Sequence, residues 1–211
     1  RTFTAIAFSL YAMHFMLNKK YVTYVALIFV AGFFHKSAFV SLVFPIFTLI
    51  KFHKTSWLVL LVSASFLEPY LNTLVKYLVG AYMPEYLIYL KPTEAQEGTK
   101  AILFLAGISL FFILFSKSII KDDKNMEFFL NAYLFGVFIY LLFVSYGTAA
   151  HRLTLYATIL IVFILPKFFY MLRPLYVKQV ALTSVHLILL FFFFYTIIGG
   201  ADTYLPYRII F

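Results

Sequence analysis

Residues 20–50 read KYVTYVALIFVAGFFHKSAFVSLVFPIFTLI, two apolar runs separated by a polar turn at His35-Lys36. Neither run alternates polar and apolar residues, which excludes a membrane β-strand, and each has a length suited to an apolar helix. One continuous helix would place Lys20 and Lys51 on opposite faces of a membrane, whereas a break at the turn keeps both on one face. These residues therefore predict two helices in a short re-entrant-like hairpin.

The whole chain has the same apolar character. Of its 211 residues, 64% are hydrophobic and 12% are charged, whereas soluble domains have about 25% charged residues. The sequence predicts an all-α polytopic membrane protein with about eight transmembrane helices, at 2–17, 20–35, 37–50, 55–67, 101–116, 127–146, 153–172 and 178–198. We expect one multi-span domain over residues 1–211, with a polar extracytoplasmic loop at 84–100. After Glu68-Pro69, the helix at 55–67 either continues with a kink into 70–82 or gives way to an interfacial amphipathic helix.

Other features of the composition narrow the class further. The chain contains no cysteine, which excludes disulfides and cysteine-ligated metals. An apolar run begins at Thr2, directly after Arg1 and without a signal-peptide pattern, so we expect a fragment that lacks N-terminal spans. The net charge of +9 lies mainly between the apolar runs, where membrane orientation explains it, and we expect no nucleic-acid partner.

The distribution of Lys and Arg between the connecting segments predicts the orientation of the chain. The more basic face, which we assign to the cytoplasm, holds Lys19, Lys20, Lys51, Lys54, Lys117, Lys121, Lys124, Lys167, Arg173 and Lys178. The outer face holds Arg1, Lys36, Lys76, Lys91, Lys100, Arg152 and Arg208.

Basic residues recur where predicted helices begin on the outer face. These ends carry Arg1, His35-Lys36-Ser37, Thr99-Lys100 and His151-Arg152. A cation at a helix N-terminus is disfavoured by about 0.3–1 kcal/mol, so the recurrence indicates a compensating anion. Free backbone N–H groups and Arg side chains bind phosphate or pyrophosphate, with Ser37 and Thr99 as candidate caps. The alternative is that these cations only contact lipid head groups.

Two of these ends contain residues suited to catalysis. The imidazole of His35 lies at a helix break, and imidazoles titrate near neutral pH and can act as general bases. The alternative is a histidine that only hydrogen-bonds the backbone of the turn. Arg152 must enter or border an apolar helix, where charge is costly and usually functional.

The chain resembles the EpsG family of bacterial Wzy-type exopolysaccharide, capsule and O-antigen polymerases. The features that carry the resemblance are Arg1 at the head of a span, His35-Lys36-Ser37-Ala38, Arg152-Leu153-Thr154-Leu155-Tyr156 with Pro166 after it, and Pro206-Tyr207-Arg208. Members of the family join lipid-linked oligosaccharide repeat units on the outer face of the cytoplasmic membrane. The resemblance covers nearly the whole chain and corresponds to the C-terminal two-thirds of a typical member.

The resemblance implies glycosyl transfer from an undecaprenyl pyrophosphate-linked glycan to a hydroxyl of a second lipid-linked unit. Arg1 and Arg152 are then the catalytic charge clamps on the pyrophosphate, and His35 is the catalytic base. The implied substrate-binding residues are Lys36, Ser37, His151, Tyr156 and Arg208. The implied partners are the lipid-linked donor and acceptor, membrane lipids, a flippase and a chain-length regulator. We expect no cofactor and a metal-independent reaction, because no carboxylate cluster adjoins the basic ends.

Two other functions fit parts of the pattern. A transporter or flippase of an anionic or lipid-linked substrate would also use outward helix N-termini, but would need more polar groups near the middle of the bilayer. An intramembrane hydrolase or acyltransferase could pair Ser37 or Ser145 with a histidine, although neither serine lies in a nucleophile-elbow pattern.

Overall fold

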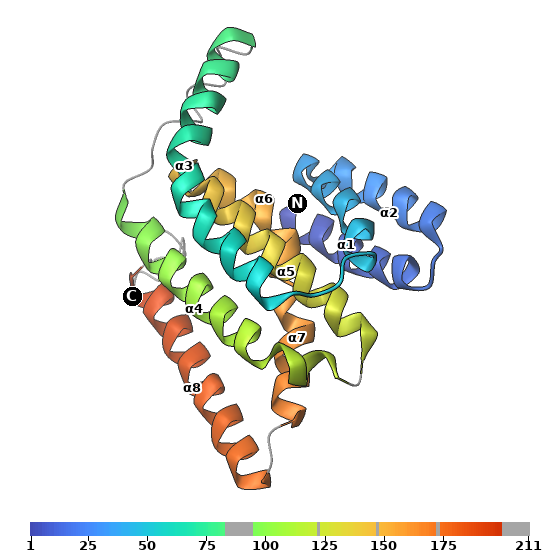
Figure 1. Cartoon of the computed structure of the whole chain (residues 1–211), viewed down its shortest axis with the longest axis vertical. Coiled ribbons are helices and arrows are strands. Elements are labelled where there is room, and N and C mark those ends of the chain that lie inside the picture. The colour runs from blue at the N-terminus through green and yellow to red at the C-terminus, as the bar shows by residue number, and fades with distance from the viewer. Residues whose placement is uncertain (83–94, 122, 147, 172–173, 200–211) are drawn as a thin grey trace, which may run out of the picture. The chain divides into compact units, whose positions relative to one another are not determined.

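The structure is a computed structural model that describes residues 1–82, 95–121, 123–146, 148–171 and 174–199. The regular elements in these ranges are helices (Figure 1), which confirms the predicted all-α membrane fold. Among the described residues, three helices are long and apolar enough to cross a membrane, at Lys54–Tyr82, Ile102–Ile120 and Asn125–Leu142, and a bent helix pair can form a fourth span. The number of eight crossings stays a prediction, because the three apolar helices before Lys54 are shorter than this.

The chain divides into two compact units, Arg1–Ile164 and Leu165–Phe211. The second unit contains the end of α7 (Ile161–Met171) and α8 (Leu175–Gly199). Within it, Lys178 Nζ lies 5.0 Å from the centroid of the Tyr170 ring. The described residues that form the candidate site all belong to the first unit.

The first two helices form an antiparallel hairpin, drawn in blue in Figure 1. They are α1 (Thr2–Leu17) and α2 (Tyr21–Phe34), close to the predicted bounds. Lys19 adopts a left-handed backbone conformation in the turn, and the Lys20 N–H donates to the carbonyl oxygen of Phe15 at 2.8 Å. Buried alanines on both helices allow close packing. At the other end of the hairpin, the rings of Phe8 and Phe34 stack with centroids 5.5 Å apart.

The predicted break at His35 is present, and a 3-10 helix, η1 (Lys36–Thr48), follows it. His35 has an extended backbone (φ −157°, ψ 119°) that ends α2. Gly32 lies against the Phe39 ring, which an added Cβ would approach to 2.4 Å. The Tyr24 hydroxyl donates to the backbone carbonyl of Ser41. These contacts fold η1 back along α2, as the hairpin interpretation requires.

The next element, α3 (Lys54–Tyr82), is one helix that continues through Pro69. Of the two alternatives after residue 67, continuation of the helix is therefore correct. At 1.5 Å per residue the helix is about 43 Å long, more than the hydrocarbon thickness of about 30 Å. The predicted loop at 84–100 is wrong at its end, because α4 (Ala95–Ile120) begins at Ala95. The remainder of that loop, up to residue 94, lies outside the described residues.

The core of the first unit surrounds α5 (Lys124–Leu142), which packs against α3, α4 and α6 (Figure 1). Polar contacts fix the preceding segments to α5. Trp57 Nε1 donates to Asn131 Oδ1 at 2.8 Å, and Asn131 Nδ2 donates to the Ile50 carbonyl at 2.8 Å. The Phe52 N–H donates to Glu127 Oε1 at 2.6 Å. The start of α3 and the end of η1 are thereby attached to the same part of α5.

The predicted spans 127–146 and 153–172 differ in detail from the structure. The first ends at Leu142 and is followed by a short 3-10 turn, η3 (Val144–Tyr146). The second consists of α6 (Thr148–Thr158) and α7, which meet at an angle of 44°. At this bend the backbone changes to the tighter i→i−3 pattern, with Leu160 N–H donating to the Ala157 carbonyl at 3.1 Å. Hydropathy does not detect such a bend, because it leaves the apolar run unbroken.

Candidate functional site

His35, Ser37 and Tyr156 form a hydrogen-bonded group, called the His35 group below, which joins the α2–η1 turn to α6. His35 Nδ1 and Ser37 Oγ are 2.6 Å apart. Ser37 Oγ lies 3.3 Å from the Tyr156 hydroxyl, across 119 positions of sequence. Tyr156 is fully buried, while His35 and Ser37 are half-buried. The residues of the group on the turn are therefore partly accessible, whereas its residue on α6 is enclosed by packing.

The local conformation of the turn positions the imidazole. Because His35 is extended and the chain then enters η1, the His35 ring can cap the new helix, and Nδ1 accepts the Ser37 N–H at 3.3 Å. The expectation that Ser37 caps this helix is wrong, since the cap is His35. Thr99 is not the cap of α4 either, because that helix begins at Ala95.

The basic residues His151 and Arg152 lie on the first turns of α6. Arg152 precedes Tyr156 by four residues, so the two side chains share a helix face with Cβ atoms about 5–6 Å apart. Unlike Tyr156, Arg152 and His151 are exposed. The structure thus places the long cationic side chain of Arg152 one helical turn from Tyr156.

Arg1 lies at the same end of the molecule as His35. It caps α1 through its backbone and is exposed, and the antiparallel α1–α2 hairpin puts the start of α1 at the end of the hairpin where α2 finishes (Figure 1). Lys36 is exposed in the turn itself. Within the described ranges, no hydrogen bond joins Arg1, Lys36 or Arg152 to the three bonded residues. Arg208 lies outside the described residues.

The predicted cytoplasmic segments meet at the opposite end of the first unit. A cavity of about 270 Å³ there is lined by Lys19 from the α1–α2 turn, by Thr48 and Ile50 at the end of η1, and by Asn125 and Glu127 at the start of α5. Three segments predicted on one face of the membrane are therefore neighbours in space. The His35 group and the start of α6 lie at the other ends of the same elements.

A second polar cluster lies directly before α6 and was not anticipated from the sequence. Ser145 Oγ donates to Glu68 Oε1, and the Tyr146 hydroxyl donates to Asn72 Oδ1 at 2.8 Å. The cluster fixes η3 to α3, and thereby sets where α6 begins. A carboxylate inside an apolar run is a signal that could have drawn attention to Glu68, but nothing in the sequence marks its partners.

The electrostatic environment of this cluster keeps Tyr146 protonated. Burial raises the pKa of Tyr146 above its ordinary value, and the nearby negative charge of Glu68 raises it further. Both effects disfavour the phenolate. The phenol therefore remains a hydrogen-bond donor to Asn72.

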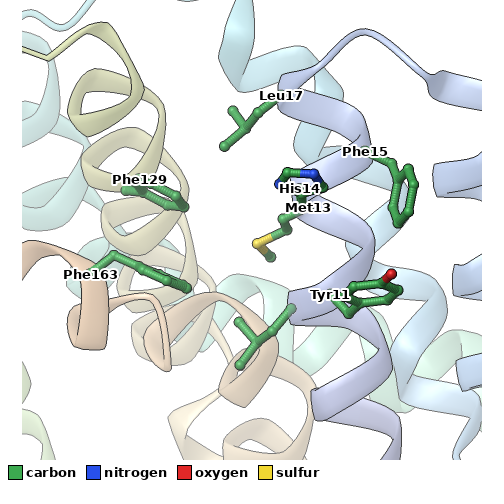
Figure 2. Close-up of a pocket in the computed structure, with 8 residues that line it drawn as sticks. Tyr11, Met13, His14, Phe15, Leu17, Phe129 and Phe163 are labelled. Carbon is green, nitrogen blue, oxygen red and sulfur yellow. The ribbon is translucent and has the colours of Figure 1, made fainter.

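A larger cavity, of about 500 Å³, lies away from the His35 group. Figure 2 shows its lining, with Met13 and His14 of α1 facing a space bounded by Phe129 and Phe163. The His14 ring is within hydrogen-bond distance of Asn18 Nδ2, at 3.3 Å. Because the other lining residues are apolar or aromatic, this cavity lacks the cationic groups that the site at the α2–η1 turn presents.

Comparison with known proteins supports the family suggested by the sequence motifs. The chain matches the EpsG family over residues 1–209, a range that includes the His35 turn and the start of α6. No curated protein and no solved structure matches the chain. Membership in this family is consistent with a polysaccharide polymerase of the glycosyltransferase type. Because the match covers nearly all of the sequence, the chain belongs to the EpsG family.

Proposed function

We propose that this chain is a metal-independent membrane glycosyltransferase that polymerises lipid-linked oligosaccharide repeat units. Its donor and acceptor are undecaprenyl pyrophosphate-linked glycans, and it acts at the outer face of the bacterial cytoplasmic membrane. A flippase supplies its substrates, and a chain-length regulator acts with it. Family membership supports the polymerase class, and the chemistry of the described site supports glycosyl transfer.

The observation that carries the proposal is the chain of hydrogen bonds from His35 through Ser37 to Tyr156 on α6, one helical turn from Arg152. Glycosyl transfer to a sugar hydroxyl needs a base for the attacking hydroxyl, and it needs positive charge at the leaving pyrophosphate. The imidazole provides the first and the exposed guanidinium provides the second. These groups come from parts of the chain that are far apart in sequence, so their proximity results from the fold.

The other exposed cations extend the same surface. Arg1 is the second charge clamp, since it lies at the His35 end of the α1–α2 hairpin. Lys36 and His151 adjoin the two principal residues in sequence and are exposed. Together with Arg208, they serve as further phosphate contacts. The pyrophosphate group is thus held by several charges, while the base acts on the acceptor.

Replacement of Arg152 tests the proposal. In cells that supply the lipid-linked unit, Arg152→Ala should abolish long polymer and cause single lipid-linked units to accumulate on the outer face. Lys76→Ala is the matched control, since it removes an exposed cation on α3 that is not one of the proposed phosphate contacts. Normal chain length in Arg152→Ala would contradict the assignment. Accumulation of units on the inner face would instead support a transporter.

A further inference from the structure

We infer that the proton of the acceptor hydroxyl reaches His35 through the hydroxyl of Ser37, and not by direct contact between sugar and imidazole. The inference rests on the proposed glycosyl transfer and adds a catalytic role for Ser37. It also makes Tyr156 a positioning residue.

The imidazole nitrogen that can accept a proton is Nδ1 of His35. The backbone N–H of Ser37 points to His35 Nδ1 at 3.3 Å. An N–H donor requires a lone pair at its acceptor, so Nδ1 is unprotonated and the neutral ring carries its hydrogen on Nε2. The basic atom of the ring is therefore Nδ1. Its nearest polar neighbour is Ser37 Oγ, at 2.6 Å.

The hydroxyl of Ser37 has one hydrogen to donate and two lone pairs that can accept. Ser37 Oγ is placed to donate to the Tyr156 hydroxyl at 3.3 Å, but its single hydrogen cannot serve both neighbours. When that hydrogen lies on the shorter line to Nδ1, the phenol of Tyr156 becomes the donor to Ser37 Oγ. One lone pair of Ser37 Oγ is then left for a further donor. Since Ser37 is only half-buried, this lone pair can accept the hydroxyl of an incoming sugar.

In the transfer itself, the acceptor oxygen forms a bond to the anomeric carbon of the donor, and the bond from that carbon to the pyrophosphate oxygen breaks with its electron pair on the leaving group. The acceptor proton passes to Ser37 Oγ as the serine proton passes to His35 Nδ1, which leaves an imidazolium and a neutral serine. Because the proton occupies the Nδ1 lone pair, the 3.3 Å bond from the Ser37 N–H is given up in this step. Tyr156 is fully buried and takes no part beyond orienting the serine oxygen.

Kinetics of polymer formation by the full-length protein in lipid nanodiscs test the role of the hydroxyl. Ser37→Ala should lower kcat about 100-fold, the lower range for general base catalysis, and leave KM for the acceptor unchanged. Ser37→Thr, which retains the hydroxyl, should recover most of the rate. Tyr156→Phe should lower kcat about 10-fold with unchanged KM. Ser41→Ala is the control, because its buried hydroxyl has no hydrogen-bond partner among the described residues. An unchanged kcat, or a loss confined to KM, in Ser37→Ala would overturn the inference.

A measurement without substrate separates this inference from the proposed function. Nitrogen-15 NMR of the histidine rings, with His35 assigned by its loss in His35→Gln, should show the tautomer protonated on Nε2. A ring protonated on Nδ1 would overturn the proton path, whatever the protein catalyses. The Nε2 tautomer in a wild-type protein that forms no polymer from lipid-linked donor and acceptor would overturn the proposed function, while the order of hydrogen bonds stood.

Discussion

The hydroxyl oxygens of Ser37 and Tyr156 lie 3.3 Å apart, although 119 positions of sequence separate the two residues. This contact joins the α2–η1 turn, which contains His35, to α6, which contains Arg152. Taken alone, the turn is explained as a helix break and the start of α6 as an interfacial helix end. Their contact through buried Tyr156 places them together in the fold, as the proposed function requires.

Replacement of His35 by Gln should remove the base and preserve a polar side chain of similar size. We expect polymerisation to fall by about 10²–10⁴-fold, the range for loss of general base catalysis, with little change in thermal unfolding. The measurement is initial polymerisation rate beside a melting curve in detergent. Polymer made at the normal rate would reduce His35 to a capping residue of η1.

Close packing of α5 on α6 makes Gly136 sensitive to any added atom. A Cβ at this position would lie 2.5 Å from the Cβ of Ala157, the neighbour of Tyr156. Overpacking of this kind costs about 1–3 kcal/mol, so Gly136→Ala should lower stability and, by displacing α6, polymer output. Chemical denaturation in detergent gives the first quantity.

Gly107 provides the matched control for that substitution. It lies in helix α4, and an added Cβ would meet no described atom within 4 Å apart from its chain neighbours and the backbone of its own helix. Gly107→Ala should be neutral or stabilising by about 0.5–1 kcal/mol, because Ala is the better helix former. Equal destabilisation by the two substitutions would show that the α5–α6 contact is not the cause.

The hydrogen bond from Ser145 to Glu68 should position α6 whether or not the side chain at residue 68 carries a negative charge. Glu68→Gln keeps an oxygen that can accept from Ser145, and we expect near-normal stability and polymer output. Glu68→Leu leaves the serine hydroxyl unpaired, at a cost of about 1–3 kcal/mol, and should also lower polymer output. If both variants lose activity at normal stability, the negative charge itself is required.

Metal independence can be checked directly. Polymerisation by wild-type protein should be unchanged after dialysis against EDTA and unchanged by added Mg²⁺ or Mn²⁺, because the proposed charge stabilisation uses guanidinium groups. The rate of polymer formation with and without chelator is the measurement. A loss restored by one of these cations would show that arginine alone does not stabilise the leaving group.

Parts of the fold could be predicted closely and others could not. The break at His35 was predictable because it interrupts an apolar run and keeps Lys20 and Lys51 on one side. The continuation of α3 past Pro69 was left open. A proline within a helix removes one backbone hydrogen bond, and whether the helix continues depends on the packing of neighbouring helices. The start of α4 at Ala95 was missed because its first residues are polar.

The sequence by itself determined that this protein is a bundle of apolar helices with basic turns. In a bilayer each backbone N–H and C=O must be satisfied within its own helix, so the helical type of the elements follows from local composition. Only the tertiary structure decided that Ser37 meets Tyr156 and that Glu68 holds Ser145. Those contacts depend on which helices pack together and how each is rotated about its axis, and hydropathy along one dimension carries no information on either.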